Sequence, residues 1–195
     1  MSGKQLWVLT GGNGAGKSTF YSTALAPRGV KLVNADVIAK IINPDHPEHV
    51  SYEAAGIAEK IREALLHRGA CFCFETVFSH PSKIDFIATA KALGYEVILV
   101  YIHLETPALN EARVRQRVMQ GGHDVPAEKI YSRLPRTQKH VKKAMSLVDE
   151  TRVLDNSYRD DPFRQVAVLK RGRCVWKSEP LPEWAREILP NLTLC

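Results

Sequence analysis

The sequence has no long apolar run, few cysteines and no internal repeat. None of its apolar runs approaches the roughly 18 residues that a bilayer-spanning helix needs, and the opening MSGKQLWVLTGG has no apolar core typical of a signal peptide. The four cysteines, Cys71, Cys73, Cys174 and Cys195, lack the spacing of metal ligands, and we expect them to be reduced. No low-complexity linker divides the 195 residues, so we expect one soluble, cytoplasmic domain over residues 1–195, without membrane contact.

What the sequence does contain is a glycine-rich segment directly after the apolar run at residues 6–9. Residues 11–18 read GGNGAGKS and fit the pattern G-x-x-x-x-G-K-[ST] of the phosphate-binding P-loop. A glycine-rich turn need bind nothing, but here every fixed position matches between an expected strand and an expected helix. We therefore expect an ATP site formed by Gly11, Gly12, Asn13, Gly14, Ala15, Gly16, Lys17, Ser18 and Thr19.

Within this segment, two side chains have chemical roles. Lys17 is placed to reach the β and γ phosphates, and the Ser18 hydroxyl is placed to bind Mg²⁺. The expected cofactors are thus ATP and Mg²⁺.

Alternating apolar and helical segments predict an α/β fold. Expected strands cover residues 6–9, 30–35, 71–74, 96–104 and 151–154, and helical patterns separate most of them. This order predicts a three-layer P-loop kinase fold with a five-stranded parallel sheet, in which the P-loop strand is central. Residues 160–195 add a small C-terminal β-hairpin and a short helix.

Acidic residues follow three of the expected strands, where ligands bind in open parallel sheets. Asp36 follows the second strand, and we interpret it as the general base and as a substrate contact. Glu75 follows the third strand and could contact the substrate or a water molecule of Mg²⁺. We interpret Asp155 as an ordinary turn residue.

Arginines flank a glycine-containing loop in residues 113–140, which we interpret as a lid. Arg113 and Arg117 are four residues apart on one helix, and Arg133 and Arg136 follow the loop GGHDVP at residues 121–126. Phosphoryl transfer builds negative charge that such arginines stabilise. We expect Arg117, Arg133 and Arg136 to act in catalysis and Arg113 to bind substrate, whereas His123 receives no role.

Four segments together resemble the zeta-toxin family of P-loop kinases, especially its short chromosomal members. They are GGNGAGKST at residues 11–19, NAD at 34–36, FETVFSH at 74–80 and RVRQRVMQGGHDVP at 113–126. The resemblance covers residues 5 to about 157 and implies transfer of phosphate from ATP to a sugar hydroxyl of UDP-N-acetylglucosamine. It also implies an antitoxin protein as a partner.

The same resemblance gives roles to individual residues. Lys17 and Ser18 take the phosphate and metal roles, Asp36 is the base, Glu75 and Thr76 face the acceptor, and Arg117 with Arg133 or Arg136 supplies the charge of the lid. Longer members of the family have additional C-terminal substrate-binding structure, so the identity of the acceptor stays open for this chain.

Two other functions compete with a small-molecule kinase. A nucleotide-switched regulatory or binding ATPase is disfavoured because the sequence has neither an LSGGQ-like segment nor an N-K-x-D guanine-binding motif. The formal net charge of +6 favours anionic partners, which leaves a polynucleotide kinase as an alternative. However, the basic residues are spread along the chain without interleaved aromatic residues, so we expect no nucleic-acid partner.

Overall fold

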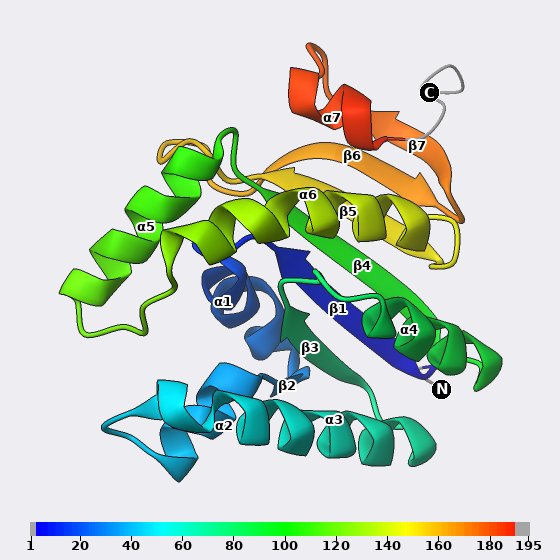
Figure 1. Cartoon of the computed structure of the whole chain (residues 1–195). Coiled ribbons are helices and arrows are strands. Elements are labelled where there is room, and N and C mark those ends of the chain that lie inside the picture. The colour runs from blue at the N-terminus through cyan, green and yellow to red at the C-terminus, as the bar shows by residue number, and fades with distance from the viewer. Residues whose placement is uncertain (1–2, 190–195) are drawn as a thin grey trace.

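The structure, a computed structural model, describes residues 3–189 and is built around one seven-stranded sheet (Figure 1). The strands are β1 (Gln5–Gly11), β2 (Lys31–Val33), β3 (Phe72–Thr76), β4 (Glu96–His103), β5 (Glu150–Asp155), β6 (Arg164–Lys170) and β7 (Arg173–Lys177). The helices are α1 (Lys17–Phe20), α2 (Ala35–Ile42), α3 (Ser51–His67), α4 (Ser82–Ala92), α5 (Pro107–Met119), α6 (Ala127–Ala144) and α7 (Glu183–Ile188). The remaining helical turns are the π-helical turn η1 (Tyr21–Leu25) and the 3₁₀ turns η2 (Ala26–Arg28) and η3 (Pro47–Val50).

The strand order is β2-β3-β1-β4-β5-β6-β7, which places the P-loop strand β1 between β3 and β4. Strands β2, β3, β1, β4 and β5 are parallel, as the sequence predicts. Every residue of β4 after Glu96 is buried, as expected for a strand covered on both faces. The central position of β1 is therefore confirmed.

The C-terminal hairpin and helix are present, but the sheet is larger than the five parallel strands that the sequence predicts. Strand β6 pairs antiparallel with β5, and β7 pairs antiparallel with β6, so the hairpin extends one mixed sheet to seven strands. Without β6, the outer edge of β5 would leave a row of backbone N–H and C=O groups unpaired. The buried apolar residues Val166, Ala167 and Leu169 fix the hairpin against the core.

Helices cover both faces of the sheet (Figure 1). One apolar cluster packs residues of α3, α4, α6 and α7 against alternate sheet residues such as Leu6 and Val8. A second cluster on the opposite face packs α1 and η1 against Trp7 and Leu9. The alternation along β1 thus divides the core into the layers of a three-layer α/β fold.

The segment after β2 differs from the sequence prediction. The strand ends at Val33, and Asp36 lies in the first turn of α2 rather than at a strand end. Asn34 caps this helix, because its Oδ1 accepts a hydrogen bond of 2.7 Å from the Asp36 backbone N–H. The sequence pattern did not separate the two elements, because a single residue, Asn34, lies between the end of β2 and the start of α2.

Two further sequence predictions concern cysteines and membrane spans. Cys71 and Cys73 are free, as expected, but the expectation for Cys174 is wrong because this residue is disulfide-bonded. Cys195, and the rest of the C-terminal region after Leu189, lie outside the described residues. Within residues 3–189, no helix has both the length and the apolarity needed to cross a membrane.

A buried histidine links the sheet to α7. His103 at the end of β4 is 6% exposed, and its ring centroid lies 4.1 Å from that of Trp184. Its Nδ1 shares a hydrogen bond of 2.8 Å with the Tyr101 hydroxyl. Burial lowers the pKa of His103 to about 4, and the nearby Asp155 only partly opposes this effect.

This histidine predicts a loss of stability in mild acid. The pKa of His103 falls from 6.5 in the unfolded chain to about 4 in the folded chain. The contribution of neutral His103 to the free energy of unfolding is therefore complete above pH 6.5 and is lost as the pH falls toward 4. The expected slope is about 1.4 kcal/mol per pH unit. Denaturant titrations between pH 7 and 4 should show a shallower slope for His103→Gln, whereas the exposed His67→Gln should match the wild type. Equal slopes for all three proteins would contradict this role.

Candidate active site

A cleft of about 1220 Å³ is lined by the P-loop, α2, the segment after β3 and the lid. It lies beyond the carboxyl ends of the parallel strands, where ligands bind in this class of sheet. Twelve of the predicted site residues line it: Asn13, Gly14, Gly16, Lys17, Ser18, Thr19, Asp36, Glu75, Thr76, Arg113, Arg117 and Arg133. The predicted residues Gly11, Gly12, Ala15 and Arg136 are not among the lining residues.

The P-loop is held in place by two buried asparagines that the sequence motif did not reveal. Asn110 of α5 donates from Nδ2 to the Asn13 carbonyl at 2.6 Å, and Asn156 after β5 donates to the Ala15 carbonyl at 2.9 Å. The fit around the loop is tight, since a Cβ atom on Gly14 would lie 2.6 Å from the Asn110 carbonyl oxygen. Gly14 also has a φ of +78°, which L residues adopt at a cost.

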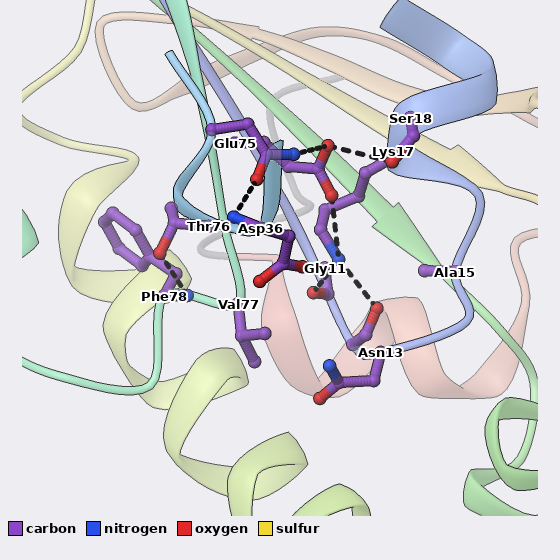
Figure 2. A network of polar contacts seen from close by, with 12 residues as sticks. Gly11, Asn13, Ala15, Lys17, Ser18, Asp36, Glu75, Thr76, Val77 and Phe78 are labelled. Carbon is purple, nitrogen blue, oxygen red and sulfur yellow. Dashed lines mark hydrogen bonds and ion pairs between the residues drawn. The ribbon is translucent and has the colours of Figure 1, made fainter. Parts of the chain in front are cut away.

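Lys17 is 7% exposed and folds back over the loop (Figure 2). Its Nζ donates to the carbonyl oxygens of Gly11 at 3.0 Å and Gly12 at 2.9 Å, and lies 3.9 Å from the Glu75 carboxylate. Burial lowers the pKa of Lys17, whereas Glu75 and then Asp36 raise it, and Arg117 lowers it further. These effects show that three predicted site residues lie close enough to Lys17 to act on its charge.

Glu75 connects the P-loop to the neighbouring strand ends (Figure 2). Its Oε2 accepts hydrogen bonds from the Ser18 hydroxyl at 3.0 Å and from Asn34 Nδ2 at 2.9 Å. The sequence left two roles open for Glu75, contact with the substrate and contact with a water molecule of Mg²⁺. The hydrogen bond to the Ser18 hydroxyl, which is predicted to bind Mg²⁺, favours the second role.

The residues around Ser18 fit a magnesium ion that is bound together with a nucleotide. One hydroxyl and one carboxylate are oxygen donors, and Mg²⁺ commonly combines so few protein ligands with phosphate oxygens and water. Within the described residues 3–189, no group of three or more His, Cys, Asp or Glu side chains is arranged to hold a metal ion.

The segment after β3 is fixed by helix α6. The Thr76 hydroxyl accepts a hydrogen bond from the Phe78 backbone N–H at 3.0 Å, and Thr137 of α6 donates to the Val77 carbonyl at 2.8 Å. His140 of the same helix contacts the Phe78 carbonyl at 3.0 Å. Helix α6 therefore sets the position of Thr76 at the cleft, a function that the sequence did not indicate.

The lid brings three of the four predicted arginines to the cleft. Arg117 donates from Nη2 to the His123 carbonyl at 2.6 Å, which folds the loop between α5 and α6 back on its own helix. Arg113 reaches the Ser157 carbonyl at 3.4 Å, and Arg133 lines the cleft from α6. Arg136 instead is exposed, with its Nε donating to the Ser132 carbonyl at 3.0 Å, and lies outside the cleft lining.

Asp155 serves a local structural role. Its carboxylate accepts hydrogen bonds from the Ser157 backbone N–H and from Arg164, and its side chain is 2% exposed. This arrangement stabilises the turn after β5, in line with its interpretation as a turn residue.

Comparison of the sequence with models of protein families identifies the family of this chain. A family model described as "AAA domain" matches residues 6–140, which include the P-loop, Asp36, Glu75 and the lid. The chain belongs to this AAA domain family. An uncharacterized protein from Haemophilus influenzae is 34% identical over 128 residues, a match that covers 62% of this chain and 90% of that protein.

Solved structures show a similar fold at low sequence identity. A crystal structure of AvrRxo1-ORF1:-ORF2 with ATP has a TM-score of 0.73 at 18% identity, and the match covers 97% of this chain but only 65% of the other. A structure from the PezAT chromosomal toxin–antitoxin system of Streptococcus pneumoniae has a TM-score of 0.63 at 17% identity, with coverage of 97% and 78%. The resemblance to the zeta-toxin-like P-loop kinases is thus confirmed in the fold.

The packing of the P-loop predicts that Gly14→Ala weakens nucleotide binding. The added methyl group would collide with the Asn110 carbonyl and displace the loop, so the affinity for Mg·ATP should fall at least 10-fold. Gly29→Ala is the matched control, because Gly29 has a similar φ of +73° but no atom within 4 Å of the added group. Titration with a fluorescent ATP analogue measures the affinity, and thermal unfolding checks that both variants fold. Equal affinities of the two variants would contradict the predicted packing.

Proposed function

We propose that the chain is an ATP- and Mg²⁺-dependent kinase that transfers the γ-phosphoryl group to a hydroxyl of a small molecule. The proposal rests above all on one observation: Lys17, Asp36, Glu75 and Arg117 line one cleft, in which the Lys17 ammonium lies 3.9 Å from the Glu75 carboxylate. The cleft thus gathers a lysine to bind the phosphates of ATP, a candidate base, a carboxylate beside the proposed magnesium site and a cation of the lid.

Each group has a defined part in the proposed transfer. The acceptor hydroxyl oxygen attacks the γ-phosphorus while its proton passes to the Asp36 carboxylate. The bond between the γ-phosphorus and the β–γ bridging oxygen breaks, and ADP leaves with the electron pair. Lys17, Arg117 and Arg133 would stabilise the negative charge on the transferred group.

Magnesium would be held at Ser18 and, directly or through water, at Glu75. When bound, it would neutralise charge on the β and γ phosphates. Glu75 already accepts the Ser18 hydroxyl proton in a hydrogen bond, so the same two side chains can orient the ion without a large rearrangement.

We propose a nucleotide-sugar such as UDP-N-acetylglucosamine as the acceptor, on the basis of the zeta-toxin-like motifs and fold. The PezAT structure belongs to a toxin–antitoxin system, which supports an antitoxin protein as a partner of this chain. A regulatory ATPase and a polynucleotide kinase stay as alternatives, distinguished by the product that carries the transferred phosphate.

The role of Asp36 predicts that Asp36→Asn loses phosphoryl transfer. Removal of a general base should lower kcat by about 10²-fold or more, while the neutral isostere leaves ATP binding in place. Purified protein, labelled ATP, Mg²⁺ and a panel of UDP-sugars provide the assay, and Asp85→Asn on the exposed face of α4 is the control. Release of inorganic phosphate alone, or labelling of polynucleotides alone, would reject the proposed reaction in favour of an alternative.

The lid geometry predicts that two arginines on one helix differ in effect. Arg133→Ala should lower kcat by on the order of 10²-fold because Arg133 lines the cleft. Arg136→Ala should stay near the wild-type rate, since Arg136 is directed to the Ser132 carbonyl outside the cleft lining. The same labelled-ATP assay measures both rates. A larger loss of kcat for Arg136→Ala than for Arg133→Ala would contradict the assignment of Arg133 to the active site.

A further inference from the structure

Two cationic side chains on α3 and α4 line the same cleft but have no part in the transfer described above. Arg62 lies on α3 and Lys83 lies at the start of α4. Neither belongs to the P-loop or the lid, and no sequence motif singles them out. They form the wall of the cleft that α3 and α4 build.

Arg62 is unusually buried for an arginine, with 7% of its surface exposed. Its guanidinium carbon lies 5.3 Å from the ring centroid of Phe74 and 5.6 Å from that of Phe86, so the aromatic rings hold the side chain in place. Its Nε is buried without a hydrogen-bond partner among the described residues. The described chain thus leaves one donor of this arginine unpaired, and a guanidinium that lines the cleft can donate to an acceptor group that enters there.

Lys83 adds a second positive charge to the same wall. Burial lowers the pKa of Lys83, the positive charge of Arg62 lowers it further, and Glu59 raises it. Its Nζ donates a long hydrogen bond of 3.4 Å to the Ser82 hydroxyl. Two positive charges on one wall of the cleft repel each other, and a bound anion would relieve this repulsion.

The carboxylates nearby do not pair with either cation. Glu59 and Glu63 affect the pKa of Arg62 through space, but both are exposed on its own helix. The ion pairs found within residues 3–189 include neither Arg62 nor Lys83. The wall therefore carries positive charge that no carboxylate of the described chain neutralises at close range.

We propose that Arg62 and Lys83 form a subsite for a phosphate group of the acceptor. A guanidinium beside an ammonium matches the charge and the several oxygens of a phosphate group. This inference builds on the proposed kinase function, because it takes the cleft beside Asp36 as the acceptor site. It assigns two residues of the chain to a phosphate group of the acceptor, such as the diphosphate of a nucleotide-sugar, and excludes neutral sugars.

The test measures phosphate binding separately from catalysis. The P-loop is first saturated with the non-hydrolysable ATP analogue AMPPNP and Mg²⁺, and inorganic phosphate is then titrated by calorimetry. The wild type should bind phosphate, and Lys83→Gln should weaken this binding at least 10-fold. Lys60→Gln on the exposed surface of α3, outside the cleft lining, should bind phosphate as the wild type does.

Arg62 needs a conservative variant because it packs against two aromatic rings. Arg62→Lys keeps the charge and should retain more phosphate affinity than Arg62→Gln, with circular dichroism confirming that each protein is folded. If Lys83→Gln binds phosphate as tightly as Lys60→Gln does, or if glycerate displaces phosphate better than glycerol 3-phosphate does, the phosphate subsite is rejected. Failure of AMPPNP to bind the wild type would instead reject the nucleotide site, so the two proposals fail by different results.

Discussion

The site depends on the carboxylate of Glu75. It accepts hydrogen bonds from Ser18 and Asn34 and lies 3.9 Å from the Lys17 ammonium, so it joins the P-loop, the end of β2 and the end of β3. These segments come from three separate parts of the chain and meet only because β3 lies between β1 and β2 in the sheet. The strand order thus brings together Ser18, Lys17 and Glu75, the groups proposed to bind metal and phosphate.

A buried lysine at this position must have compensating contacts. An ammonium removed from water is strongly destabilising unless it is paired and hydrogen-bonded, and here two P-loop carbonyls and Glu75 provide that stabilisation. The carbonyl contacts can be exchanged for phosphate oxygens without moving the loop, because the asparagines at 110 and 156 hold its backbone from outside. The loop is therefore organised before a nucleotide arrives, which lowers the entropic cost of binding.

The sequence predicts those features that depend on local pattern. The P-loop follows from fixed residue types at fixed spacing, and the five parallel strands follow from buried apolar runs. The mixed sheet could not be predicted, because pairing of β6 with β5 depends on which edge the hairpin meets in space. The burial of Arg62 could not be predicted for a similar reason. In the sequence Arg62 is one charged residue on an amphipathic helix, and only its packing against Phe74 and Phe86 in the fold shows that it is buried.

Asn34 couples the two halves of the proposed reaction. Its Oδ1 accepts the Asp36 backbone N–H and its Nδ2 donates to Glu75, so one amide contacts both the candidate base and the metal-side carboxylate. The orientation of this amide is fixed, because the backbone N–H requires an acceptor and the carboxylate requires a donor. A single side chain, 9% exposed, therefore links the first turn of α2 to the end of β3 through hydrogen bonds that involve no residue of the lid. In the proposed reaction the lid supplies arginine charge, whereas the candidate base Asp36 and the carboxylate of Glu75 are positioned by the cap of α2 and by the sheet.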